Sequence, residues 1–184
     1  MRLTTIIISG APGTGKSAIR RHAPYFFRQY YGAAAALDTD EYYPLFDPQW
    51  TTNNRDWWKI ATDTSLYVAD YLLRCGVVIV AISSNGLYTP EAVNHVLAVL
   101  GKQSTIYHVT LDAPLATLIA RVEQRGDLAE HPADWLAAWQ THIRSYYAAW
   151  TYVLDNGNLS LEETLEAIHV YIGDERNALS TRIE

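Results

Sequence analysis

Residues 10–17 read Gly10-Ala11-Pro12-Gly13-Thr14-Gly15-Lys16-Ser17, and this stretch decides which fold the sequence predicts. It matches the pattern G-x-x-x-x-G-K-[ST] in full. Residues 3–8, rich in threonine and isoleucine, precede it as a strand buried on both faces would. Residues 18–27 follow it with apolar side chains at helical spacing. A glycine-rich loop between a strand and a helix is the arrangement that binds nucleotide phosphates.

Each residue type in this loop has a physical role. Glycine adopts positive φ and lets the main chain approach the phosphates, so that consecutive N–H groups converge on the β-phosphate near a helix N-terminus. Lys16 then bridges the β- and γ-phosphates, and the Ser17 hydroxyl ligates Mg²⁺. The alternative is a simple tight turn, but the specified positions match by chance in only about one chain of this length in a few hundred. We therefore expect residues 10–17 to bind ATP, with Mg²⁺ as its companion ion.

Beyond the loop, strand-like and helical segments alternate along the chain. Further strands are expected at 33–37, 77–82, 105–111 and 152–154, and further helices at 56–74, 90–100, 112–126, 132–150 and from residue 160 onward. Asp112 is expected to cap the helix that follows it, and Ser160 with Glu163 forms a capping box. The helix at 132–150 carries an aromatic stripe that we expect to serve packing. This alternation predicts an α/β domain with a five-stranded, mainly parallel sheet.

Length and composition restrict the class of protein. The chain has 184 residues, so we expect one domain, residues 1–184. Its net charge of −6 disfavours nucleic acid and anionic membranes as partners. The single cysteine, Cys75, cannot form an internal disulfide; we expect it to be buried, and we expect a cytoplasmic location. The longest apolar run, residues 77–82, is far below the roughly 20 residues of a membrane-spanning helix.

Four pieces in a fixed order carry a resemblance to a known family. They are residues 10–17; Asp38-Thr39-Asp40; Leu111-Asp112-Ala113-Pro114 with Arg121-Val122-Glu123-Gln124-Arg125-Gly126; and Val153-Leu154-Asp155 with Ser160-Leu161-Glu162-Glu163. Together they cover most of the chain, and they resemble the small P-loop kinases. That group includes shikimate kinase, gluconate kinase, chloramphenicol phosphotransferase and the zeta-toxin kinases. The loop is the specific signal, and the other three pieces gain force from their order.

The resemblance implies a three-layer P-loop NTPase domain with strand order 2-3-1-4-5 and a small lid at about 121–134. It implies that Arg121 lies beside the adenine, that Arg125 reaches the transferring phosphate from the lid, and that Asp155 belongs to the loop on the adenine side. Arg121 and Arg125 are one helical turn apart, so both share a face; the alternative for each is a solvated helix surface. A monomer or a homodimer is expected.

Asp38 and Asp40 are the candidate carboxylates. Phosphoryl transfer to an alcohol needs cations to offset the phosphate charge and a carboxylate to orient the attacking hydroxyl or accept its proton. Lys16, Asp40 and Arg125 are therefore the predicted catalytic residues, with Asp38 on the Mg²⁺ side through water. Two residues one position apart face opposite ways in a strand, so a turn is needed for both to serve one site. The alternative is a solvated Asx-type turn.

The acceptor side is expected near two further segments. Residues 81–86, Ala81-Ile82-Ser83-Ser84-Asn85-Gly86, lack the terminal aspartate of a Walker B motif, and Ser84 and Asn85 can hydrogen-bond an acceptor or simply form a turn. Residues 42–58 hold six aromatic residues, which either line an acceptor pocket or pack the core, and Arg55 is available for an anionic group.

These patterns favour an ATP-dependent kinase that phosphorylates a hydroxyl of a small molecule. The competing hypothesis is an ATPase or nucleotide-dependent switch that moves a protein partner, which the missing Walker B acid disfavours. A polynucleotide 5′-kinase is disfavoured by the negative charge and the absence of a basic stripe. The identity of the acceptor does not follow from the motifs.

Overall fold

A parallel β-sheet forms the centre of the protein. The computed structural model describes residues 2–45, 57–147 and 151–179. The strands are β1 (Thr4–Gly10), β2 (Ala34–Asp38), β3 (Ile79–Ser83), β4 (Thr105–Asp112) and β5 (Tyr152–Asp155). They form one sheet in the order β2-β3-β1-β4-β5, and every pair is parallel. The expected strand order and parallel sheet are confirmed. The loop at 10–17 leaves the carboxyl end of the central strand.

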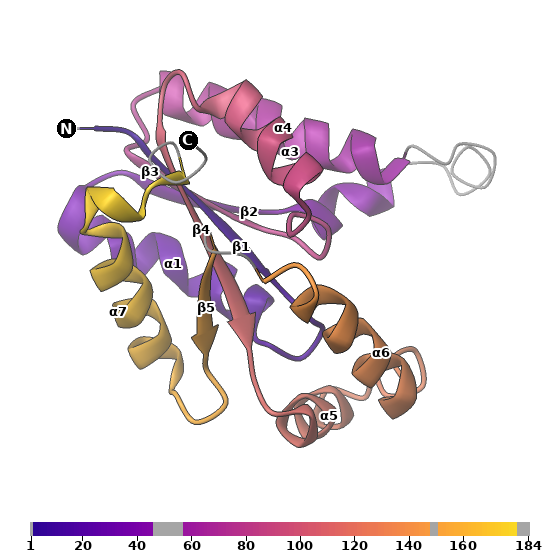
Figure 1. Cartoon of the computed structure of the whole chain (residues 1–184). Helices are drawn as coiled ribbons and strands as arrows, with labels where there is room; N and C mark the ends of the chain where they lie inside the picture. The colour runs from indigo at the N-terminus through magenta and orange to yellow at the C-terminus, as the bar shows by residue number, and fades with distance from the viewer. Residues whose placement is uncertain (1, 46–56, 148–150, 180–184) are drawn as a thin grey trace.

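Helices cover both faces of this sheet (Figure 1). On one face lie α1 (Lys16–Tyr31) and α7 (Leu161–Ile172), and on the other lie α3 (Trp57–Arg74) and α4 (Pro90–Leu100). The helices α5 (Leu115–Gln124) and α6 (Ala133–Arg144) lie beyond the carboxyl end of β4, and 3₁₀ turns occupy Thr39–Leu45 (η1) and Glu175–Asn177 (η2). The expected lid, 121–134, therefore runs from the last turn of α5 to the first turn of α6.

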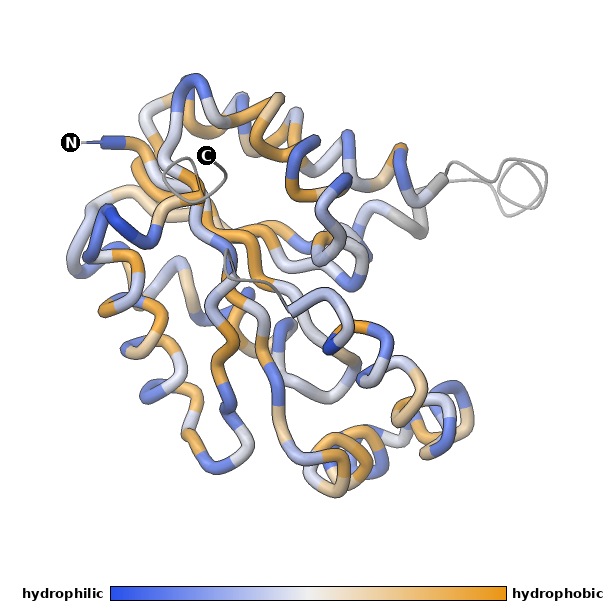
Figure 2. The backbone as a smooth tube through the Cα atoms, in the orientation of Figure 1, coloured by the Kyte–Doolittle hydropathy of each residue, from blue (hydrophilic) through white to orange (hydrophobic). Residues whose placement is uncertain are grey.

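Alternate residues of β1 divide the core between the two faces. Ile6 and Ile8 pack in a cluster with residues of α1 and α7, whereas Ile7 packs with residues of α3 and α4. All three side chains are fully buried, which explains why the strand shows no apolar–polar alternation. Figure 2 shows the hydrophobic residues concentrated along the central strands. Burial on both faces makes β1 a rigid base for the loop.

Helix ends agree with the sequence signals in some places and differ in others. Thr89 accepts a hydrogen bond from the Ala92 amide at the start of α4, and the capping box of Ser160 with Glu163 is present. Asp112, however, does not cap α5, whose N-cap is Pro114. Its carboxylate instead accepts hydrogen bonds from α6. The prediction for Asp112 was wrong because a side chain at the end of β4 can reach a neighbouring helix that is remote in sequence.

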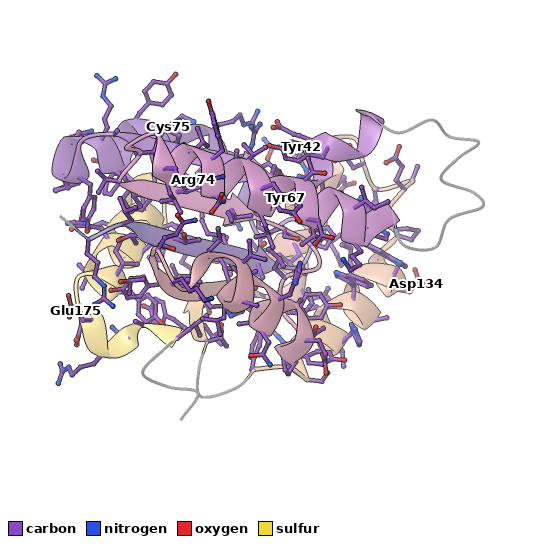
Figure 3. All side chains as sticks on the ribbon, turned by 90° about the horizontal axis from the view of Figure 1, so that it is seen from above. Tyr42, Tyr67, Arg74, Cys75, Asp134 and Glu175 are labelled. Atoms are coloured by element: carbon purple, nitrogen blue, oxygen red, sulfur yellow. The ribbon has the colours of Figure 1, made fainter. Side chains whose placement is uncertain are left out.

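Two further predictions need correction. The helix predicted at 132–150 ends at Arg144, where the Ser145 hydroxyl donates to the His142 carbonyl at 2.6 Å and caps the last turn. Cys75 is exposed rather than buried (Figure 3). It follows the last residue of α3, and the inward face of that helix is already occupied by Leu73. A residue two positions later points about 200° away from Leu73. In the described ranges, none of the helices has the length and apolarity needed to cross a membrane.

Two aromatic residues of α1 test the layered core. Phe27 is 1% exposed and Tyr25 is 67% exposed, although both lie on the same helix. We expect Phe27→Ala to lower the free energy of unfolding by about 3–5 kcal/mol, because it leaves a cavity between α1 and the sheet. Tyr25→Ala should change it by no more than about 0.5 kcal/mol. Urea unfolding followed by circular dichroism measures both, and equal losses would contradict this assignment of faces.

Candidate active site

The loop between β1 and α1 is shaped by three glycines. Gly10, Gly13 and Gly15 have φ values of +145°, +85° and +95°. A Cβ on Gly13 would lie 2.9 Å from the Leu118 carbonyl oxygen, and one on Gly10 would lie 2.5 Å from that of Leu111. The loop backbone is thus packed directly against α5 and β4. Only glycine combines these φ values with such close approach.

Lys16 begins α1 and turns back over the loop. Its Nζ donates to the carbonyl oxygens of Gly10 at 2.7 Å and Ala11 at 3.1 Å, and the residue is 8% exposed. Burial lowers the pKa of Lys16 to about 8, against the opposing effect of the carboxylates of Asp40 and Asp38. The side chain of Lys16 is therefore partly deprotonated near pH 8. A phosphate anion beside it would restore the charged form.

A cavity of about 610 Å³ opens in front of the loop. It is lined by residues 12–19, by residues of β2, η1, α3, α5, α6 and α7, and by the loops that follow β3 and β5. The lining includes the predicted residues Pro12, Gly13, Thr14, Gly15, Lys16, Ser17, Asp38, Asp40, Asn85, Arg121 and Arg125. The folded chain thus gathers around one cavity groups that are separated by more than a hundred residues in sequence. Their individual roles remain predictions.

Asp38 and Asp40 both line this cavity because the chain turns between them. β2 ends at Asp38, and η1 begins at Thr39. The Asp40 amide donates to Asp38 Oδ1 at 3.1 Å, which is the Asx-type bond of the alternative interpretation, so the turn and the shared cavity occur together. Burial, followed by the charge of Asp38, raises the pKa of Asp40 above its ordinary value. Such a shift brings a carboxylate closer to the range of a useful general base.

The two arginines of the expected lid differ in environment. Arg121 is half-buried, and its Nη2 donates to the Asn156 carbonyl oxygen at 3.0 Å while Nη1 lies 3.4 Å from that of Gly13. It therefore ties the phosphate loop to the loop after β5. Arg125 is exposed, lines the cavity and pairs with Asp127 at 3.3 Å. Arg125 is thus the less firmly held of the two side chains, since an exposed ion pair contributes little.

Four predicted residues that the structure describes, Gly10, Ala11, Ser84 and Asp155, are not among those that line the cavity. Asp155 is exposed and accepts a hydrogen bond from the Gly157 amide, and its buried neighbour Asn156 lines the cavity instead. Ser84 is buried, and its hydroxyl accepts a hydrogen bond from that of Thr39 at 3.0 Å. Arg55 lies outside the described residues, as do the side chains of 43–57.

Sequence reasoning missed Asn156, although its environment is distinctive. Its Nδ2 donates to the Thr14 carbonyl oxygen at 2.7 Å, which fixes the phosphate loop from the side of β5. The signal in the sequence was only the turn tripeptide Asp155-Asn156-Gly157. His131, Trp135 and Trp139 were also missed as site residues, since they line the cavity from the region of α6. The helical spacing of Trp135 and Trp139 had predicted packing alone, and no role had been predicted for His131.

Comparisons with known proteins bear on the fold. No protein-family model matches the chain, and no curated protein matches it by sequence. Several solved structures do match the chain. One is the APS kinase of Mycobacterium tuberculosis in complex with AMPPNP and APS, which is 18% identical. The match covers 94% of this chain and 99% of that chain, with a TM-score of 0.65. The Acinetobacter baumannii shikimate kinase in complex with shikimate is also 18% identical, with coverages of 99% and 96% and a TM-score of 0.57.

A third similar structure is the tunicamycin resistance protein of Deinococcus radiodurans. It is 17% identical, with 94% of this chain and 96% of that chain covered and a TM-score of 0.61. Matches of this length across several kinases confirm the resemblance noted in the sequence. The chain has the fold of the P-loop kinases.

Gly13 and Gly32 form a matched pair for testing the loop. Their φ values are +85° and +86°, but a Cβ on Gly32 would meet nothing within 4 Å. We expect Gly32→Ala to lower the free energy of unfolding by about 1–3 kcal/mol through backbone strain alone, since its φ and ψ of +86° and −115° are unfavourable for a residue with a Cβ. Gly13→Ala should cost more, because the loop must also move away from α5. Urea unfolding measures the difference, and equal costs would contradict the close packing of the loop.

Proposed function

We propose that this protein transfers the γ-phosphate of ATP to a hydroxyl group of a small molecule. The observation that carries the proposal is the meeting of Lys16 and Asp40 at one cavity, in front of a glycine-shaped loop. The first residue suits a phosphate, and the second suits the proton of an attacking alcohol. A site built only for holding a nucleotide would have no need of a half-buried carboxylate with a raised pKa.

The residues present fit ATP and Mg²⁺. Positive φ at Gly13 and Gly15 leaves the main chain of the loop open to close approach by phosphate oxygens, and Ser17 offers its hydroxyl at the cavity surface. Asp38 lies at the same cavity with its carboxylate 3.9 Å from Arg20 Nε. Ser17, and Asp38 through water, would hold the magnesium ion, which when bound offsets negative charge on the β- and γ-phosphates.

The transfer assigns one role to each charged group. Asp40 accepts the proton of the acceptor hydroxyl as its oxygen attacks the γ-phosphorus in line with the leaving ADP. One P–O bond forms to the acceptor, and the bond between the γ-phosphorus and the β,γ-bridging oxygen breaks. Lys16 and Arg125 neutralise charge on the phosphates during this exchange. Arg121, held between Gly13 and Asn156, borders the place proposed for the adenine.

The structural neighbours support this class of reaction. Among them are an APS kinase with AMPPNP and APS, a shikimate kinase with shikimate, and a sugar kinase, which use the same fold. The identities are too low for the acceptor of any of them to be transferred to this chain. The competing hypothesis, a nucleotide-dependent switch, would hydrolyse ATP without any need for an acceptor.

Asp40→Asn tests the chemical step. We expect acceptor-dependent ADP formation to fall by about 10²–10⁴-fold, because the amide cannot take up the hydroxyl proton. Binding of a non-hydrolysable ATP analogue should remain. Glu166→Gln, an exposed acid on α7, is the control and should keep full turnover. Undiminished turnover in Asp40→Asn would remove the proposed base. ADP release that ignores every acceptor would favour the switch.

The lowered pKa of Lys16 predicts that nucleotide binding is coupled to the uptake of a proton. Its pKa in the free protein is about 8, and the phosphates of ATP should raise it. Near pH 9 the free amine is mostly neutral and the bound one protonated, so binding takes up a proton and weakens as pH rises above about 8. Below pH 7 no uptake by this group is expected. Calorimetry in buffers of different ionisation enthalpy measures the uptake.

Two lysine variants provide the controls for this linkage. Lys59→Met removes an exposed lysine of α3 and should leave the uptake unchanged. Lys16→Met should abolish it and weaken binding. Unaltered ATP affinity and turnover in Lys16→Ala would overturn the proposed function as a whole.

A further inference from the structure

The side-chain amide of Asn85 is bonded to the proposed base. Its Nδ2 donates to Asp40 Oδ2 at 2.7 Å. The opposite orientation of the amide would bring two oxygens face to face, so the carboxylate decides which end of the amide it meets. Among the described residues, the other side-chain donor recorded at this carboxylate is the Thr39 hydroxyl, 3.5 Å from Oδ1. The bond from Asn85 is therefore the close contact that holds the Asp40 side chain.

This contact continues the pairing of two parallel strands beyond their ends. The last paired positions of β2 and β3 are 38 and 83. At the next positions, 39 and 84, the Thr39 hydroxyl donates to that of Ser84 at 3.0 Å. One position further, Asn85 meets Asp40. Side-chain hydrogen bonds thus take over from the main-chain ladder, and they hold the turn after β2 to the loop after β3.

The loop that carries Asn85 is itself attached to the central strand. The Ser84 amide donates to the carbonyl oxygen of Ile8 at 3.0 Å, and Ile8 is fully buried in β1. The Ser84 hydroxyl also accepts from the Gly86 amide at 3.0 Å, which closes the turn around residue 85. Since β1 leads directly into the phosphate loop, a bond from Asn85 places Asp40 relative to that loop.

The other end of the Asn85 amide is poorly suited to packing. Its Oδ1 is buried and has no hydrogen-bond partner among the described residues. A buried oxygen without a donor is destabilising, and an apolar side chain of similar shape, such as leucine, would avoid that cost. Asparagine therefore serves this position through its donor, which faces Asp40. A polar group kept at a cost to stability is more typical of a functional position than of a core position.

One oxygen of the Asp40 carboxylate is left for the reaction. Oδ2 accepts from Asn85, whereas the hydroxyl 3.5 Å from Oδ1 donates its hydrogen to Ser84 instead. A bond to Oδ2 restricts rotation of the carboxylate and thereby fixes the direction of Oδ1. Such restriction matters for proton transfer, because a displacement of about 1 Å in a reacting group can lower the rate about 10²-fold.

We propose that Asn85 is a positioning residue for the phosphoryl transfer, which holds Asp40 by Oδ2 and leaves Oδ1 for the proton of the attacking hydroxyl. That proton passes to Oδ1 as the new P–O bond forms and the bond to the leaving ADP breaks, and Asn85 keeps both of its amide hydrogens. In this role Asn85 acts through Asp40, whereas the sequence had suggested a direct bond to the acceptor. The inference rests on the proposed function, since Asp40 is the base of the same reaction.

The separation of kcat from KM tests this role. The purified full chain is given ATP and Mg²⁺, with water alone or with concentrated glycerol as the attacking hydroxyl, and ADP formation is followed. We expect Asn85→Leu to lower kcat about 10–10²-fold and to leave KM for ATP within about twofold. Asn94→Leu, the same substitution on the exposed face of α4, should change neither. A raised KM for ATP without loss of kcat, or no change in either, would overturn the inference.

A double-mutant cycle tests whether Asn85 acts through Asp40. In the Asp40→Asn chain no base is left to position, so adding Asn85→Leu should change kcat by no more than about twofold. A residue that only supports the fold would lower kcat by the same factor in both backgrounds, and that result would also overturn the inference. Circular dichroism checks that each variant is folded. Asn85→Ala replaces Asn85→Leu in the cycle if the leucine variant does not fold.

The same variants separate failure of this inference from failure of the proposed function. If Asp40→Asn loses turnover while Asn85→Leu keeps it, the inference is wrong and the proposed base stands. If Asp40→Asn keeps full turnover, or if Lys16→Ala turns over ATP as the unaltered chain does, the proposed function fails first and the inference fails with it.

Discussion

The backbone of the loop at residues 10–17 packs directly against the backbone of β4 and α5, and the rest of the site depends on this contact. Gly10 and Gly13 approach the carbonyl oxygens of Leu111 and Leu118 so closely that neither position has room for a Cβ. This contact holds the loop against β4 and α5 without any side chain between them. The rigid, doubly buried β1 then fixes where the loop starts. The loop is thereby held between β1, β4 and α5.

Burial acts on the two charged groups of the site in opposite directions. It lowers the pKa of Lys16 and raises that of Asp40, so each group is moved toward its neutral form even though the two attract each other. Desolvation therefore outweighs their mutual attraction in the free protein. A bound triphosphate would change this balance at Lys16 first. Under the proposed function, Lys16 would meet the phosphates and Asp40 the acceptor hydroxyl.

Asp112 connects the sheet to the aromatic wall of the cavity. Its carboxylate accepts from Gln140 at 2.7 Å and from Arg144 at 2.9 Å, which attaches α6 to the end of β4. Trp135 and Trp139 lie on that helix. The position of the aromatic rings over the cavity thus depends on a polar contact between residues about thirty positions apart. Helical periodicity in the sequence carries no information about such a contact.

The sequence by itself determined the class of fold and the phosphate loop, because both follow from local rules. Period, capping and glycine spacing act over a few residues, so β1, the loop at 10–17 and the capping box at Ser160 were predictable. The tertiary structure alone decided which side chains share the cavity. Asn156 reaches Thr14, Asn85 orients toward Asp40, and Cys75 faces solvent because of packing between remote segments. Such contacts depend on how strands and helices assemble, which no short stretch of residues encodes.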